Sequence, residues 1–241
     1  MTLVRSALYF VWFVVVSIVF NVGCLPLLAL PRRATMFAPK AWSASLLWGL
    51  KAIAGLGFEV RGRIPADGVL VASKHMSMWD TIALYHVLHD SVFVLKQSLL
   101  NVPLYGWYAR KVGMIAIDRE AGASAMRKMV QAARDRLAKG RAVVIFPEGT
   151  RKKPDAPPDY KPGVAGLYGQ LGVACVPVAL NSSLFWTGPA GFLKKPGRIV
   201  LEFLEPIPPG LKRAEFMGAL EQRIEKATAR LLAEGRSSFM S

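Results

Sequence analysis

An uncharged, strongly apolar run near the amino terminus places the tightest constraint on how this chain can fold. Residues 6–31, SALYFVWFVVVSIVFNVGCLPLLALP, span 26 positions without a charged side chain. A helix needs roughly 20 predominantly apolar residues to cross the hydrocarbon core of a bilayer. A cleaved signal peptide is disfavoured, because the run is too long and no small-x-small cleavage site precedes Arg32. We therefore expect a membrane-resident segment rather than a helix buried in a protein core.

A second apolar helix is expected directly after this run. Pro26 interrupts the last third of the run, and residues 41–58, AWSASLLWGLKAIAGLGF, place apolar side chains at helical spacing with Lys51 on one side. Two such helices form either a hairpin within one leaflet or a membrane-crossing unit, and the sequence leaves both open. Residues 1–58 are thus predicted to be membrane-anchoring helices that precede a domain over residues 59–241.

The charges that flank the run indicate which side of the membrane the rest of the chain occupies. Arg32, Arg33 and Lys40 follow the run, whereas only Arg5 precedes it. Basic residues are retained on the cytoplasmic side of a membrane. Everything after residue 31 is therefore predicted to lie at the cytoplasmic face of the inner (cytoplasmic) membrane.

The net charge of +15 also favours a membrane as partner. Six acidic and six basic residues balance from residue 201 onward, so the excess lies in residues 1–200. A basic surface beside an apolar anchor suits an anionic bilayer, where each basic residue near the surface contributes about 1 kcal/mol. Nucleic acid is disfavoured as a partner, since no nucleic-acid-binding pattern accompanies the charge.

Short apolar strands alternate with amphipathic helices from residue 58 onward. Strands are predicted at residues 58–64, 68–74, 91–96, 113–118, 141–146, 173–180 and 197–207, and helices at residues 80–89, 103–112, 124–139, 163–172 and 214–234. Buried strands between amphipathic helices are typical of layered α/β proteins with a partly parallel sheet. The sequence therefore predicts an α/β fold in which a central sheet core is flanked by helices, after an N-terminal two-helix membrane-associated motif.

Polar side chains gather where the predicted strands end. His75 and Arg119 each follow a strand, Lys96 ends one, and residues 148–151 follow another. Active sites of such sheets form where strands end and loops begin. We expect these side chains to converge in one crevice.

The stretch ASKHMSMWDT places His75 and Asp80 on either side of a predicted strand-to-helix turn. Five residues within one continuous helix would separate the two side chains by about 140°. A turn at residues 75–79 removes this separation, so that the carboxylate can reach one imidazole nitrogen and leave the other as a base. Ser77 is too close in sequence to be the nucleophile and is expected to hydrogen-bond within the turn. The alternative interpretation is a histidine beside a helix whose first turn Asp80 caps.

The stretch FPEGTRKK supplies a phosphate-binding loop. Gly149 lets the backbone turn close to a ligand, and Arg151 offers a bidentate donor for phosphate. Glu148 is expected either to hold Arg151 or to accept a substrate hydroxyl. Together with Lys96 and Arg119 at neighbouring strand ends, these residues predict an anionic head group on the substrate.

No metal site is expected from the histidines and cysteines. His86 and His89 lie three positions apart on a predicted helix without a cluster of acidic or cysteine ligands. Cys24 and Cys175 fit neither zinc nor disulfide spacing and are interpreted as small apolar residues.

Four sequence blocks in this order, KHMSMWD, AIDRE, FPEGTR and VPVALN, resemble the motifs of the glycerolipid acyltransferases. The closest resemblance is to the bacterial 1-acylglycerol-3-phosphate O-acyltransferases, and it covers about residues 59–205. The chain departs from the pattern at Lys74, where many members have Asn before the histidine.

The resemblance implies transfer of a fatty acyl group from a thioester to the free hydroxyl of lysophosphatidic acid, forming phosphatidic acid. It implies that His75 is the base and that Asp80 holds it. It also implies that Arg151 binds the phosphate with help from Lys96 and Arg119, and that the backbone amides of Gly149 and Thr150 lie close to this phosphate. The donor is acyl-CoA or acyl-carrier protein, with no further cofactor. The segment VPVALNSSLFW is expected to be either a wall of the acyl path or simply a core strand.

Three alternatives remain open at the level of sequence. The same fold can acylate another lyso-lipid, such as a lyso-ornithine lipid. The histidine–aspartate pair can activate water and hydrolyse a thioester. A basic membrane-binding protein without catalysis is the third alternative. Acyl-chain length, donor and oligomeric state are not predicted.

Overall fold

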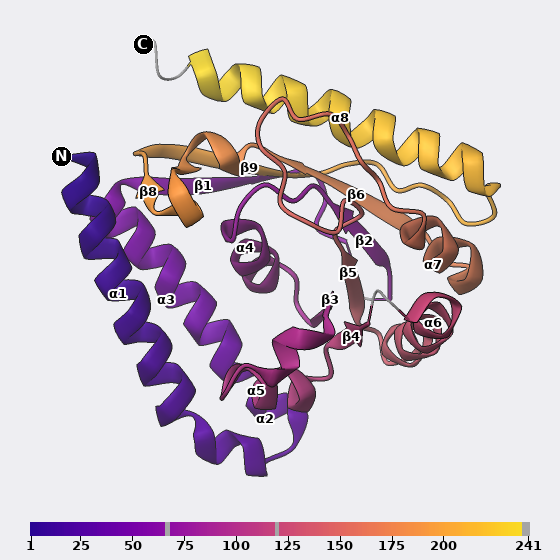
Figure 1. Ribbon diagram of the computed structural model, residues 1–241, viewed down its shortest axis with the longest axis horizontal. Helices are drawn as coiled ribbons and strands as arrows, with labels where there is room; N and C mark the ends of the chain where they lie inside the picture. Colours follow the sequence, from indigo (N-terminus) through magenta and orange to yellow (C-terminus); the bar gives the residue numbers. More distant parts are fainter. Residues whose placement is uncertain (66–67, 119–120, 238–241) are drawn as a thin grey trace.

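A mixed seven-stranded sheet forms the centre of the computed structural model, which describes residues 1–65, 68–118 and 121–237 (Figure 1). The strand order is β1-β9-β6-β2-β5-β3-β4. The strands are β1 (Leu56–Arg61), β2 (Leu70–Ser73), β3 (Ser91–Lys96), β4 (Ile115–Ile117), β5 (Ala142–Ile145), β6 (Cys175–Leu180) and β9 (Gly197–Phe203). Pairing is parallel except between β6 and β9, so β1 and β9 run opposite to the other five. The predicted α/β fold with a partly parallel sheet is confirmed.

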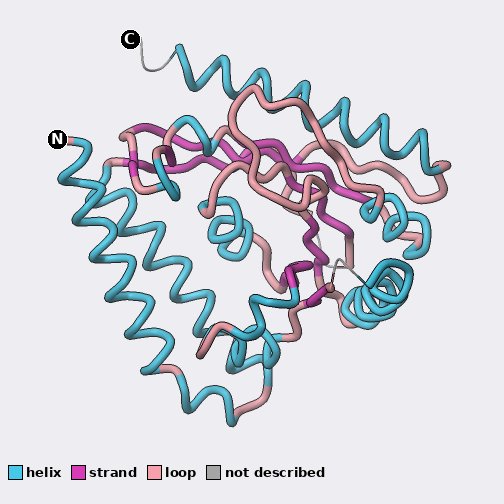
Figure 2. The backbone as a smooth tube through the Cα atoms, in the orientation of Figure 1, coloured by secondary structure: helices cyan, strands magenta, loops and turns pink. Residues whose placement is uncertain are grey.

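Helices cover both faces of this sheet (Figure 2). They are α1 (Thr2–Gly23), α2 (Arg32–Thr35), α3 (Phe37–Ala54), α4 (Trp79–Val87), α5 (Tyr105–Val112), α6 (Gly122–Ala138), α7 (Gly163–Leu171) and α8 (Arg213–Ser237). One apolar core lies between the sheet and α1, α3 and α4, and a second lies between the sheet and α6, α7 and α8. Strands β2, β5 and β6 are buried along their whole length, which explains their near-continuous apolar sequences.

The second N-terminal helix ends earlier than its apolar pattern predicts. Helix α3 stops at Ala54, because Gly55 adopts a left-handed conformation with φ of +66° that terminates the helix. Residues 56–58 belong instead to β1, which pairs with β9. The expected boundary at residue 58 therefore lies inside a strand of the central sheet.

The two long N-terminal helices pack closely against each other (Figure 1). The Trp12 indole donates to the Ser45 carbonyl (3.1 Å), and Trp12 lies directly over Gly49. A Cβ at Gly49 would come within 2.1 Å of the indole nitrogen, so only glycine fits there. At the base of the helix pair, Arg32 binds Asp90 through two bonds of 3.0 and 2.8 Å and so ties α2 to the segment before β3.

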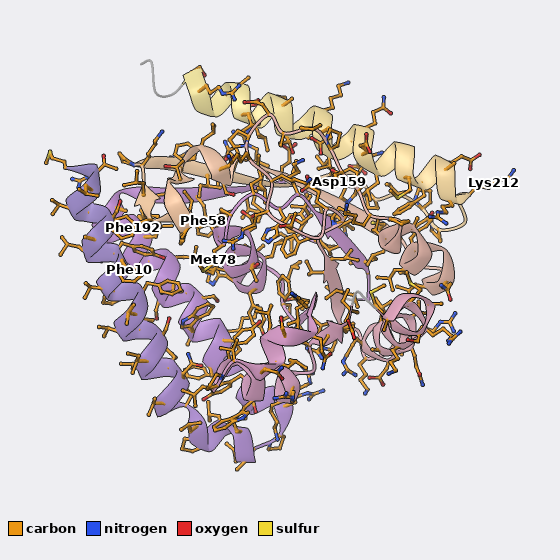
Figure 3. All side chains as sticks on the ribbon, viewed as in Figure 1. Phe10, Phe58, Met78, Asp159, Phe192 and Lys212 are labelled. Carbon is orange, nitrogen blue, oxygen red and sulfur yellow. The ribbon has the colours of Figure 1, made fainter. Side chains whose placement is uncertain are left out.

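Helix α1 contacts the rest of the chain near both of its ends. The Ser6 hydroxyl accepts the Lys194 N–H (2.9 Å), and the Asn21 carbonyl accepts the Tyr108 hydroxyl (3.1 Å). Lys194 lies in a small hairpin that the sequence did not predict, formed by β7 (Trp186–Thr187) and β8 (Leu193–Lys194). Phe10 and Phe192 meet on the same side, with ring centroids 6.0 Å apart (Figure 3).

The outward face of α1 is apolar and exposed. Its exposed side chains are Leu3, Val4, Leu8, Phe10, Val11, Val14, Val15, Ile18, Val19 and Val22. By length and composition alone, α1 can cross a membrane. Exposed apolar surface of this extent marks a contact with lipid or another apolar partner.

Candidate active site

His75 lies in the turn between β2 and α4, at the end of a central strand. Strand β2 ends at Ser73 and α4 begins at Trp79, so the residues between them form the turn that the sequence predicts. The turn brings the His75 Nδ1 to 3.0 Å from the Asp80 Oδ2. Because an ionised carboxylate only accepts, Nδ1 is the protonated nitrogen and Nε2 is left as the base.

Asp80 is fully buried and surrounded by donors. Besides the His75 ring, its Oδ2 accepts the backbone N–H groups of Met76 (2.6 Å) and Ser77 (2.8 Å). Its Oδ1 accepts the hydroxyls of Ser77 (3.1 Å) and Ser182 (2.5 Å). Five donors hold one carboxylate, so its position is fixed.

The plane of the His75 ring is fixed by Phe146. The two rings stack with centroids 3.9 Å apart and an interplanar angle of 19°. The main chain of His75 is held on both sides as well, because its N–H donates to the Glu148 Oε2 (3.2 Å) and its carbonyl accepts the Lys152 N–H (2.8 Å). The imidazole is therefore pre-organised before any substrate binds.

His75 forms part of the wall of a mainly apolar pocket of about 860 Å³. The apolar part of the wall includes Phe20, Trp42, Phe93, Leu95, Leu99, Val112, Met114, Met126, Met129 and Val164, from both N-terminal helices and from the α/β domain. Burial raises the pKa of the Tyr85 and Tyr105 hydroxyls, which also line the pocket, so both are neutral at physiological pH. A pocket of this size and polarity suits a hydrocarbon chain.

Cationic side chains border the same pocket. Lys96, Arg151 and Lys161 are exposed and line it, and Lys161 also contacts Asp159 (2.8 Å). Arg119, the other cation predicted here, lies outside the described residues. The cluster can pair with an anionic group bound in the pocket that His75 also lines.

Two residues of the FPEGTR stretch differ from expectation. Glu148 is fully buried and contacts the Lys74 ammonium and the His75 N–H, not Arg151, and it does not line the pocket. Gly149 lines the pocket, but its N–H donates to the Phe146 carbonyl (2.9 Å). Its φ of +67° shows that glycine is there for the turn, and its amide is already engaged. Thr150 lines the pocket beside Arg151.

Sequence reasoning missed three contributors to this site: Phe146, Ser182 and Lys161. Phe146 is the first residue of the FPEGTR stretch, so its place in this motif was a usable signal. Lys161 lies in the Pro-rich stretch KKPDAPPDYKPG of residues 152–163, just before α7, which is a detectable feature as well. Ser182 follows β6 and reaches Asp80 only through the sheet, so nothing local in the sequence indicates its contact.

Residues 57–181 match the model of the protein family described as Acyltransferase. The chain belongs to this acyltransferase family. The match contains His75, Asp80 and the whole FPEGTR stretch, whereas Ser182 and the pocket walls from the N-terminal helices lie outside it.

Curated relatives extend the similarity beyond that segment. The acyltransferase is 32% identical to a 1-acyl-sn-glycerol-3-phosphate acyltransferase of Pseudomonas aeruginosa, over 85% of this chain and 80% of the relative. It is 31% identical to a lyso-ornithine lipid O-acyltransferase of the same species, over 75% of this chain and 76% of the relative. The resemblance inferred from the four sequence blocks is therefore confirmed.

A solved structure shares the fold. The crystal structure of the 1-acyl-sn-glycerophosphate (LPA) acyltransferase PlsC from Thermotoga maritima superimposes with a TM-score of 0.79 and 19% identity. The match covers 96% of the acyltransferase chain and 98% of the other chain, so it includes the N-terminal helices as well as the sheet.

Proposed function

We propose that this acyltransferase moves a fatty acyl group from a thioester to the free hydroxyl of lysophosphatidic acid, forming phosphatidic acid. The observation that supports this best is the His75–Asp80 pair in the wall of an apolar pocket bordered by cations. The pocket suits an acyl chain, the cations suit a phosphate, and the imidazole lines the same pocket as both. The donor is acyl-CoA or acyl-carrier protein, and no cofactor takes part.

His75 performs the proton transfers in this reaction. Its Nε2 accepts the proton of the acceptor hydroxyl while the oxygen attacks the thioester carbonyl. The Asp80 carboxylate stabilises the imidazolium that forms, at a distance of 3.0 Å from Nδ1. When the tetrahedral intermediate collapses, the C–S bond breaks and the imidazolium returns the proton to the thiolate.

The acyl group passes directly to the acceptor in this mechanism. Ser77, the nearest hydroxyl in sequence, is buried and its hydroxyl donates to the Asp80 Oδ1. It therefore serves the turn and is not presented to the Nε2 side of His75. Direct transfer requires both substrates to be bound together.

The phosphate of the acceptor binds Arg151 and Lys96 in this proposal, with Arg119 as a further cation. Arg151 lies next to the turn at Gly149 and lines the pocket. A guanidinium binds phosphate in a bidentate manner, and a charge-assisted hydrogen bond contributes roughly 1.5–3 kcal/mol.

Replacing Arg151 with alanine is expected to raise the KM for lysophosphatidic acid about 10- to 100-fold, in keeping with the loss of one charge-assisted hydrogen bond to the phosphate. The KM for the thioester should stay close to the wild-type value. Steady-state kinetics with each substrate varied in turn measures both. Arg213→Ala removes an equal charge at the start of α8 and is the matched control, since Arg213 does not line the pocket. Loss of affinity for the donor instead of the acceptor would contradict the assignment.

A lyso-ornithine lipid is the second candidate acceptor, and the relative with that activity supports it. The two acceptors differ in phosphate, for which the cations around Arg151 provide a binding site. An assay of purified protein with a panel of lyso-lipids and both donors distinguishes the two candidates. Lysophosphatidic acid should be the preferred acceptor, and equal rates with the phosphate-free lipid would refute the choice.

Residues 1–58 anchor the acyltransferase to the cytoplasmic face of the inner membrane in this proposal. Helix α1 contacts the domain through both Ser6 and Asn21, while its outward face is exposed and apolar. This arrangement favours insertion of the helix pair into one leaflet, because a helix crossing the bilayer would leave the domain at one end. The pocket then opens beside the lipid, since Phe20 and Trp42 line it.

Anchoring by buried apolar surface predicts that washing membranes with about 1 M salt leaves the protein in place, whereas a purely electrostatic attachment is screened. A Val11→Glu/Val15→Glu double variant changes two exposed side chains of α1 and should release much of the protein. Gln131→Glu, at an exposed position of α6, is the control for added charge. Sedimentation followed by immunoblotting measures each fraction, and quantitative release of the wild type by salt would refute this anchoring.

A further inference from the structure

A buried lysine lies directly beside the proposed base. Lys74 follows β2 and its side chain is 3% exposed. Its ammonium contacts the Glu148 Oε1 (2.8 Å) and the Glu225 Oε1 (2.7 Å). Lys74 does not line the pocket, so it cannot bind a substrate there.

The two carboxylates belong to different parts of the fold. Glu148 follows β5 in the FPEGTR stretch, whereas Glu225 lies on α8. The Tyr160 hydroxyl donates to the Glu225 Oε1 (2.7 Å), and the Lys74 ammonium lies 6.0 Å from the centroid of the Tyr160 ring. Burial and Glu225 raise the pKa of Tyr160, so this hydroxyl is a neutral donor. Lys74 therefore joins the catalytic turn, the loop before α7 and the C-terminal helix.

The carboxylates also differ in their access to water. The Glu148 side chain is 0% exposed, while that of Glu225 is 28% exposed. Without Lys74, Glu225 can turn outward and be solvated. Glu148 would become a buried carboxylate with no cation beside it. The free-energy cost of this unpaired buried charge would strongly favour displacement of the side chain.

Glu148 in turn holds the main chain of the proposed base. Its Oε1 contacts Lys74 and its Oε2 accepts the His75 N–H at 3.2 Å. Two bonds in different directions fix the carboxylate plane. A displacement of Glu148 thus shifts His75, and a misplacement of about 1 Å at a reacting group can lower the rate about 10²-fold.

We propose that Lys74 is a positioning residue for the acyl transfer, acting on His75 through the buried Glu148 carboxylate. This inference rests on the proposed function and deepens it. It assigns a role to a residue at which the sequence blocks depart from the pattern they resemble.

The test is the kcat of Lys74→Met, which keeps the apolar stem and removes the ammonium. We expect kcat to fall about tenfold or more, with both KM values within about twofold of wild type, because the lost contact acts on the base and not on binding. Arg230→Gln is the matched control. It removes ion pairs of α8 with Glu202 and Glu234 that do not touch the catalytic turn, and it should keep wild-type kcat.

Two double variants separate positioning from general stability. Lys74→Met/Glu148→Gln removes the unpaired buried charge and keeps an oxygen that can accept the His75 N–H, so kcat should recover most of the loss. Lys74→Met/Glu225→Gln removes an equal charge but leaves Glu148 unpaired, so kcat should stay low. If Lys74→Met alone does not fold, as judged by circular dichroism, the comparison of the two double variants decides.

Equal kcat in the two double variants, an unchanged kcat in folded Lys74→Met, or an effect on KM alone would overturn the proposal. Failure of the proposed function would have a different signature. The wild-type protein would then form no phosphatidic acid from lysophosphatidic acid and a thioester.

Discussion

The His75→Ala protein is expected to turn over about 10²–10⁴-fold more slowly than wild type, the usual cost of removing a general base. The imidazole is held by Asp80 at 3.0 Å and stacked on Phe146 at 3.9 Å, and its second nitrogen remains to accept the acceptor proton. Alanine leaves no group that can do this. The measurement is kcat for phosphatidic acid formation at saturating donor and acceptor.

His86→Ala is the matched control for His75→Ala. His86 lies on α4, is exposed and contacts Phe58 edge-on, away from the pocket. Its loss should leave the rate near that of wild type. Both proteins should give wild-type circular dichroism spectra. Near-normal turnover in folded His75→Ala would contradict the assignment of the base.

Asp80→Asn is expected to lower kcat by about 10²-fold or more, because the neutral amide no longer stabilises the imidazolium. The structure also indicates how the amide fits. Its oxygen replaces Oδ2, which faces three N–H groups, and its NH₂ faces the Ser77 and Ser182 hydroxyls, which can turn to accept. The variant should therefore fold and lose rate rather than structure.

The His75→Ala/Asp80→Asn double variant tests whether the pair acts as a unit. Residues of one catalytic unit are strongly non-additive, so the double variant should be no slower than His75→Ala alone. If the two losses multiplied, Asp80 would act on the reaction independently of His75.

Local patterns were enough to predict most of the sheet and the central pair of the site. Strand β3 has the predicted bounds, and the turn after β2 brings His75 to Asp80 because only four residues separate them. The distant contacts were not predictable. Ser182 reaches Asp80 across 102 positions, and Glu225 reaches Lys74 across 151. Such contacts are set by strand order and helix packing, which the spacing of apolar residues along the sequence does not predict.

The N-terminal segment shows a second limit of pattern reasoning. The spacing of apolar residues identified both helices. The helical spacing continues past Gly55, however, and so assigned residues 56–58 to the second helix. The glycine conformation and the pairing with β9 decide this boundary. The helix pair also shares its core with α4 and the sheet, so deletion of residues 1–58 would remove the first half of the edge strand β1 and uncover apolar surface in addition to the anchor.

The most direct test of the proposed reaction measures thiol release from the acyl thioester by purified protein, with and without lysophosphatidic acid. Direct transfer by His75 predicts that thiol release requires the acceptor, equals the phosphatidic acid formed and is lost in His75→Ala. Thiol release at the same rate without acceptor, with free fatty acid as product, would contradict it and identify a thioester hydrolase.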